Sequence, residues 1–174
     1  MELLQTDDAP GKWFTASRHR LTESVKKIKH CLEQLTDEQV WWRPHDAQNS
    51  IANLVLHLCG NVRQWIISGV GGAPDVRDRP KEFSERSSIA KTELIGRLDE
   101  VVGQADAVLA EMTDQQLLEP RRIQGFDETA LSAIFDSLTH FQGHTQEIIC
   151  LTRMQLGKAY QFAWVPATKD QGAP

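Results

Sequence analysis

Four long runs of residues, in which apolar side chains recur every three or four positions, limit what this chain can fold into more than any other feature of its sequence. This spacing places the apolar side chains on one face of an α-helix. The runs extend over about residues 13–35, 49–68, 87–112 and 129–156. Helices with one apolar face each bury those faces by packing side by side, so the sequence predicts an all-α protein, a four-helix bundle.

The connections between the runs indicate two helical hairpins of similar design. Thr36-Asp37-Glu38-Gln39 follows the first run, and Thr113-Asp114-Gln115-Gln116 follows the third. In each motif the threonine is the predicted N-cap and the last glutamine reaches back to it, which forms a capping box. Residues 69–87, rich in glycine, proline and charged residues, predict a long crossover between the second and third helices, and residues 118–128 predict a polar link.

Size and composition favour one cytoplasmic domain that binds neither nucleic acid nor a membrane. We expect the bundle to span residues 13–166, after a flexible segment 1–12 and before a disordered tail 167–174. The net charge of −5 and the scattered basic residues argue against nucleic acid. The acidic start lacks the apolar core of a signal peptide, and every apolar run is too short to cross a bilayer. Three widely spaced cysteines do not form a disulfide framework and fit a reducing compartment.

Three histidines in two of the runs are candidate metal ligands. His140 and His144 are four residues apart, so both rings leave one face of the predicted fourth helix. His57 lies at the border between the apolar and polar faces of the predicted second helix. Three imidazoles with one open position are typical of a catalytic zinc or a related ion. The alternative is a polar core in which hydrogen bonds satisfy the same histidines without a metal.

A few further residues are candidates for catalysis or for lining a pocket. Asp136 lies one turn before His140, and Glu147 follows His144. Either carboxylate is a candidate base, although a carboxylate near a helix N-terminus is favourable without any catalytic role. The polar neighbour of His57 and three tryptophans can line a pocket, and the tryptophans can equally fill the end of the core: Asn53, Trp41, Trp42 and Trp65.

Two stretches around the histidines resemble the DinB-like superfamily, which includes bacillithiol S-transferases and mycothiol-dependent maleylpyruvate isomerases. They are residues 50–61, SIANLVLHLCGN, and residues 140–148, HFQGHTQEI, and Trp42-Arg43-Pro44 resembles the first hairpin turn of that family. The resemblance covers about residues 13–166. It implies a DinB-like four-helix bundle with a crossover, a homodimer, and zinc or nickel bound by His57, His140 and His144.

Two function hypotheses follow from this pattern. The first is a metal-dependent enzyme, a transferase or a hydrolase, in which the three-histidine site activates a thiol or water for reaction with a small-molecule substrate. Transfer of a low-molecular-weight thiol is slightly favoured, because no carboxylate in the sequence stands out as the general base. The second is a non-catalytic bundle with a structural or stress-related role, which binds a metal or a ligand and uses Glu147 as the fourth metal ligand.

Overall fold

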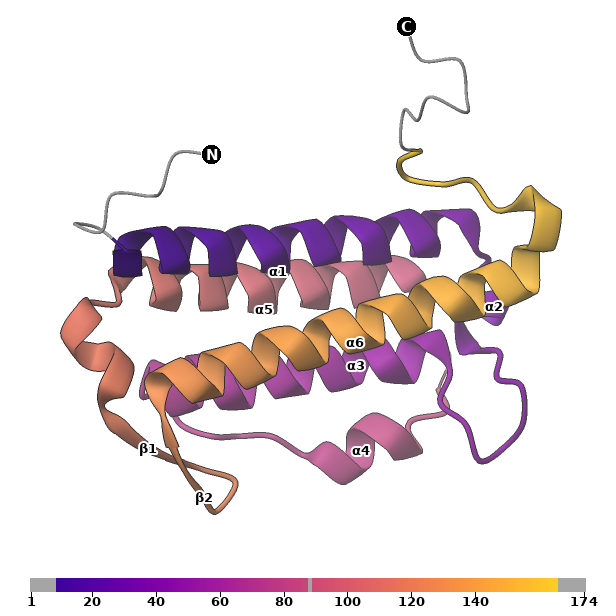
Figure 1. Cartoon of the computed structure of the whole chain (residues 1–174). Helices are drawn as coiled ribbons and strands as arrows, with labels where there is room; N and C mark the ends of the chain where they lie inside the picture. Colours follow the sequence, from indigo (N-terminus) through magenta and orange to yellow (C-terminus); the bar gives the residue numbers. More distant parts are fainter. Residues whose placement is uncertain (1–8, 88, 166–174) are drawn as a thin grey trace, which may run out of the picture.

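Four long helical segments lie side by side in the computed structural model, which describes residues 9–87 and 89–165 (Figure 1). α1 contacts α5 and α6, and α3 also contacts α5 and α6. The predicted, mostly helical fold is therefore confirmed. The long segments are α1 (Ala9–Gln34), α3 (Ile51–Val62) with a π-helical continuation (Arg63–Val70), α5 (Lys91–Glu111) and α6 (Ala130–Leu156).

The periodic apolar residues of the sequence form one continuous core between these helices. Large side chains that are almost fully buried come from every long helix, among them Leu21, Leu32, Leu58, Leu98 and Phe141. Burying a leucine or phenylalanine side chain stabilises a fold by about 1.5–3 kcal/mol. The shorter elements decorate this core: α2 (Asp37–Trp41), α4 (Arg79–Ser84), the 3-10 helices Asp114–Leu118 and Gly157–Ala159, and the strands β1 (Pro120–Ile123) and β2 (Phe126–Thr129).

Hydrogen bonds from predicted cap residues fix where several of these helices begin. The Thr36 hydroxyl accepts from the Gln39 N–H at 3.2 Å, and the Gln39 side chain accepts from the Thr36 N–H at 2.9 Å. Gln116 reaches back to the N–H of Thr113 in the same way, at 2.8 Å. Ser50 caps α3 by accepting from the N–H of Asn53 at 3.2 Å. The two similar turns and the start of the second helix are therefore confirmed.

Some boundaries differ from those that the sequence predicts. α1 begins at Ala9 rather than near residue 13, while segments 1–8 and 166–174, which hold most of the expected flexible ends, lie outside the described residues. The second helix does not end at Ser68, because the chain changes to π-helical hydrogen bonding at Arg63 and continues to Val70. Such short π-helical segments are rare and occur often at functional sites.

The crossover between α3 and α5 contains the short helix α4, which the sequence did not predict. Asp78 caps it by accepting from the Lys81 N–H at 3.3 Å, and Pro80 lies in its first turn. α4 lies against α3 (Figure 1). The Asn53 side chain ties the two together by donating to the backbone carbonyls of Glu82 at 2.9 Å and Glu85 at 3.1 Å.

The expected polar link before α6 is instead a β-hairpin of β1 and β2. Its two turn residues, Gln124 and Gly125, have φ angles of 53° and 85°, which suits a two-residue hairpin turn. The strands are short and mostly polar, so no alternating apolar pattern indicated them. Ile123 is buried against Gly69, where a Cβ atom would overlap the isoleucine side chain.

The helices found in residues 9–87 and 89–165 include none with the combination of length and apolar character that crossing a membrane requires.

Candidate metal centre

The three predicted histidines meet between α3 and α6. One ring nitrogen from each of His57, His140 and His144 lies within 4.8 Å of the others. Nε2 of His57 is 2.8 Å from Nε2 of His140, and the three ring planes cross at 81–89°. His57 is buried, and the other two are half-buried. The four-residue spacing on α6 and the border position on α3 therefore bring the rings together.

This donor set fits a small divalent ion after a slight adjustment. Zinc binds histidine nitrogen at about 2.0–2.1 Å, which places two tetrahedral nitrogen ligands about 3.3 Å apart. The contact between His57 and His140, at 2.8 Å, would need to lengthen by about half an ångström. In the part of the chain that the structure describes, this group contains three potential ligands. Three ligands leave a coordination position open, as catalytic zinc sites do.

Carboxylates engage the Nδ1 atoms of two of the three rings. Glu82 Oε2 lies 2.9 Å from Nδ1 of His57, and Glu147 Oε2 lies 2.7 Å from Nδ1 of His144. An ionised carboxylate only accepts hydrogen bonds, so each Nδ1 is assigned as the N–H donor. Nη2 of Arg77 also lies 3.1 Å from Nδ1 of His57, but the carboxylate oxygen is nearer, at 2.9 Å. The remaining nitrogen, Nε2, then carries the lone pair and faces the cluster. Metal-binding histidines are usually held in this way.

Arg77 forms a buried ion pair with Glu82, the carboxylate that contacts His57. Its guanidinium donates to both carboxylate oxygens, at 2.7 and 2.9 Å, and the side chains of Arg77 and Glu82 are only 2% and 9% exposed. Burial by itself would raise the pKa of Glu82, but the hydrogen bonds from Arg77 and His57 lower it below its usual range. Arg77 also donates to Gln64 Oε1 at 2.9 Å. The carboxylate beside His57 is therefore ionised and fixed in position.

Gly60 makes room for this ion pair on the surface of α3. A Cβ atom at position 60 would overlap the Glu82 carboxylate and lie 3.0 Å from Nε of Arg77. Gly60 is one turn after His57, so the glycine opens the helix face on which the carboxylate reaches the ring. This close approach explains a glycine in a helix interior, where alanine is favoured by about 1 kcal/mol.

His140 is held in its neutral form. Burial is the largest cause; together with the neighbouring rings of His144 and His57 and the charges of Arg77 and Arg79, it lowers the pKa of His140 to about 4. Neutral imidazole has the free lone pair that a metal ion requires.

A cavity of about 310 Å³ opens beside His57 and His140. Of the residues predicted to line a pocket, Trp65 lines it, and so does the candidate base Asp136. The other lining residues come from α3, the crossover, the hairpin and α6: Asn61, Arg77, Arg79, Gln124 and Ser137. The cavity gives a small molecule access to the cluster.

The remaining predicted pocket residues lie elsewhere. Trp41 donates its indole N–H to the carbonyl of Ile89 at 3.0 Å, and Trp42 is 41% exposed. Asn53 is buried between the N-terminus of α3 and α4. The structure therefore brings one of the three tryptophans, Trp65, to the cavity beside the histidine cluster. Asn53 does not line this cavity; its side chain holds the crossover against α3.

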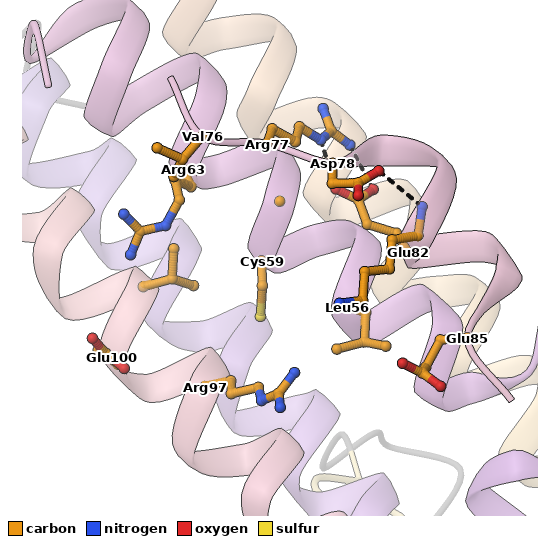
Figure 2. A pocket seen from close by; sticks show the side chains of 13 residues that line it. Leu56, Cys59, Arg63, Val76, Arg77, Asp78, Glu82, Glu85, Arg97 and Glu100 are labelled. Atoms are coloured by element: carbon orange, nitrogen blue, oxygen red, sulfur yellow. Dashed lines mark hydrogen bonds and ion pairs between the residues drawn. The ribbon is translucent and has the colours of Figure 1, made fainter. Parts of the chain in front are cut away.

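A second cavity, of about 350 Å³, lies between α3, the crossover and α5 (Figure 2). Arg77 and Glu82 line it together with Cys59, Arg63 and Arg97. Burial raises the pKa of the Cys59 thiol to about 12, so this thiol is protonated at neutral pH and a poor nucleophile. Arg77 lines both cavities.

Sequence reasoning missed the crossover residues at the site, Arg77, Arg79 and Glu82. They lie in a segment with no apolar periodicity, where charged residues ordinarily face solvent. The one available signal was Gly60, an interior helix glycine three residues after a candidate ligand, which marks a close approach of another chain segment.

Comparisons with known proteins agree with the DinB-like fold. A family model described as "Protein of unknown function (DUF1572)" matches residues 8–169. A DinB-like protein from Bacillus cereus has a TM-score of 0.65 and 20% identity, covering 82% of this chain and 90% of its own. A conserved protein from Enterococcus faecalis has a TM-score of 0.71 and 14% identity, covering 82% and 96%. No curated protein matches the sequence.

Proposed function

The chain belongs to the DUF1572 family, and we propose that it is a metal-dependent enzyme whose ion, zinc or nickel, is held by His57, His140 and His144. The main support for the proposal is that ring nitrogens of three histidines lie close together and that two of these rings have a carboxylate at Nδ1. A polar core without a metal would not require two rings to present their second nitrogens to a common point.

The reaction that the surroundings support best is transfer of a small thiol to an electrophile. When bound, a divalent ion at three neutral histidines lowers the pKa of a thiol or water in its open position. Two of the carboxylates near the rings are already engaged, Glu82 with Arg77 and His57, and Glu147 with His144. A thiol needs no general base once it is deprotonated, whereas attack by water usually does.

The chain's own residues would position the reactants. Glu82 and Glu147 orient the rings of His57 and His144, and the cavity beside His140 admits the substrate. Asp136 lines this cavity and is the candidate for moving a proton. A purely structural role is less well supported, because structural zinc sites have four protein ligands, and the group within the described residues has three.

Metal analysis of the untagged full-length protein tests the proposal. The wild-type chain is expected to retain about one zinc or nickel ion, and His144→Ala to lose most of it while remaining folded by circular dichroism. The matched control is His19→Ala, which removes an exposed histidine of α1 far along the sequence from the cluster. Equal metal content in wild type and His144→Ala would refute the assignment. Conjugation of a small thiol to 1-chloro-2,4-dinitrobenzene should disappear with the metal.

A further inference from the structure

The cavity beside the histidine cluster carries an arginine whose guanidinium is available to a ligand. Arg79 lines this cavity and is exposed. Its guanidinium carbon lies 5.0 Å from the centre of the Phe83 ring, and no carboxylate among residues 9–87 and 89–165 forms an ion pair with it. We infer that Arg79 binds a carboxylate of the substrate, so the thiol that reaches the cluster is an anionic small molecule. This inference rests on the proposed function.

Arg77, the other arginine of the cavity, is already engaged. Glu82 accepts from it through both oxygens, Gln64 accepts from a third nitrogen, and the Arg77 side chain is 2% exposed. Its charge is therefore neutralised within the protein. Arg79 supplies the unneutralised positive charge beside the cluster.

Stacking holds the Arg79 guanidinium near the cavity before a ligand arrives. The Phe83 ring contacts both Arg79 and the cluster: its centre is 5.0 Å from the guanidinium carbon and 4.8 Å from the centre of the His57 ring. A stacked guanidinium loses less freedom when it binds a ligand, and its planar edge still offers N–H donors in the geometry that a carboxylate accepts. The stack therefore leaves the donors of Arg79 free for the ligand.

The size and charge of the surroundings narrow the ligand further. A cavity of about 310 Å³ is at the lower end of small-molecule sites, so it suits a compact thiol rather than a peptide. Asp136 lines the same cavity and repels an anion, which directs the ligand carboxylate towards Arg79. The protein carries a net charge of −5, so general electrostatics disfavour anions. A measured preference for an anionic thiol would therefore need a local cause.

Binding of two matched thiols to the full-length, cobalt-loaded protein tests the inference. 3-Mercaptopropionate and 3-mercapto-1-propanol differ in a carboxylate and a hydroxyl, and the visible spectrum of the cobalt ion reports binding without any turnover. We expect the carboxylate-bearing thiol to bind roughly 10- to 150-fold more tightly, the range for one charge-assisted hydrogen-bonded pair. Arg79→Gln should bring the two dissociation constants together, and Arg79→Lys should restore part of the difference.

The matched control is Lys81→Gln, which removes the same charge from the same short helix but on the side that lines the second cavity. It should leave the preference unchanged, and the affinity of the neutral thiol should be the same in all variants if they are folded. Equal affinity of the two thiols in the wild-type protein, or a preference that survives Arg79→Gln, would overturn the inference alone. A cobalt spectrum that responds to neither thiol would overturn the proposed function, and the inference with it.

Discussion

Replacing Gly60 by alanine should damage the site through a contact that only one methyl group creates. The added Cβ atom overlaps the Glu82 carboxylate and comes within 3.0 Å of Nε of Arg77. Neither group can move aside alone, because each is the other's charge partner and both are buried. The substitution therefore pushes the ion pair off α3 and withdraws the hydrogen-bond acceptor from Nδ1 of His57.

The magnitude follows from two opposing effects. Alanine is favoured over glycine in a helix interior by about 1 kcal/mol. Separating a buried ion pair costs about 3–5 kcal/mol when one partner is left alone, and less when the two shift together on one loop. We therefore expect Gly60→Ala to lower the free energy of unfolding by about 1–3 kcal/mol. Loss of the carboxylate behind a histidine ligand should weaken metal binding by about 10- to 100-fold.

Urea unfolding followed by circular dichroism measures the first effect, and competition with a chromophoric chelator measures the second. Gly103→Ala is the control, because a Cβ atom there meets no atom within 4 Å and position 103 lies on the exposed face of α5. That variant should be more stable by about 0.5–1 kcal/mol, with unchanged metal affinity. If Gly60→Ala behaves like Gly103→Ala in both assays, the close approach of Glu82 to α3 does not exist.

Two further predictions follow from the titratable groups. Cys150 is exposed and should react with iodoacetamide at about pH 8, whereas Cys31 and Cys59 should react slowly, because burial raises the pKa of both thiols. Mass spectrometry measures the labelling, and rapid labelling of Cys31 or Cys59 in the native protein would contradict the structure. Asp106→Asn should destabilise by at most about 1 kcal/mol, because the ion pair with Arg18 is about 40% exposed. The hydrogen bond from Arg18 lowers the pKa of Asp106 below 3.8, so the ion pair contributes its full stability above pH 3.8 and loses it as the pH falls through the lowered pKa. If the unfolding free energies of wild type and Asp106→Asn still differ below that pH, the ion pair is not the cause of the difference.

The fold and the cluster could be predicted because they depend on local, periodic information. Apolar spacing specified four long helices, and cap residues such as Ser50 and Thr36 specified where some of them begin. The pair His140 and His144 shares a helix face by geometry alone. His57 was a candidate from its position at the border between the apolar and polar faces of its helix, and the resemblance supported it, because no local rule brings a residue of one helix to a residue of another.

The crossover and the hairpin could not be predicted in the same way. α4 has six residues, and its polar sequence shows no apolar face. The hairpin turn is formed by Gln124 and Gly125, whereas asparagine or aspartate before glycine is the usual signature. The change to π-helical bonding at Arg63 likewise gives no signal in a pattern of apolar residues, because a segment of 8 residues makes about two turns and is too short to establish a period of its own.

The crossover has a structural peculiarity that stability alone does not explain. A buried ion pair such as that of Arg77 and Glu82 stabilises a fold little, because taking both charges out of water offsets their attraction. Packing it against α3 also required a glycine in a helix interior. Apolar side chains would have joined the crossover to the bundle more simply. The arrangement has a physical reason if it serves to hold the Glu82 carboxylate at Nδ1 of His57, because this leaves Nε2 of the ring free to bind a metal ion. The ion pair and the glycine, which add little stability, would then be explained by the orientation of His57.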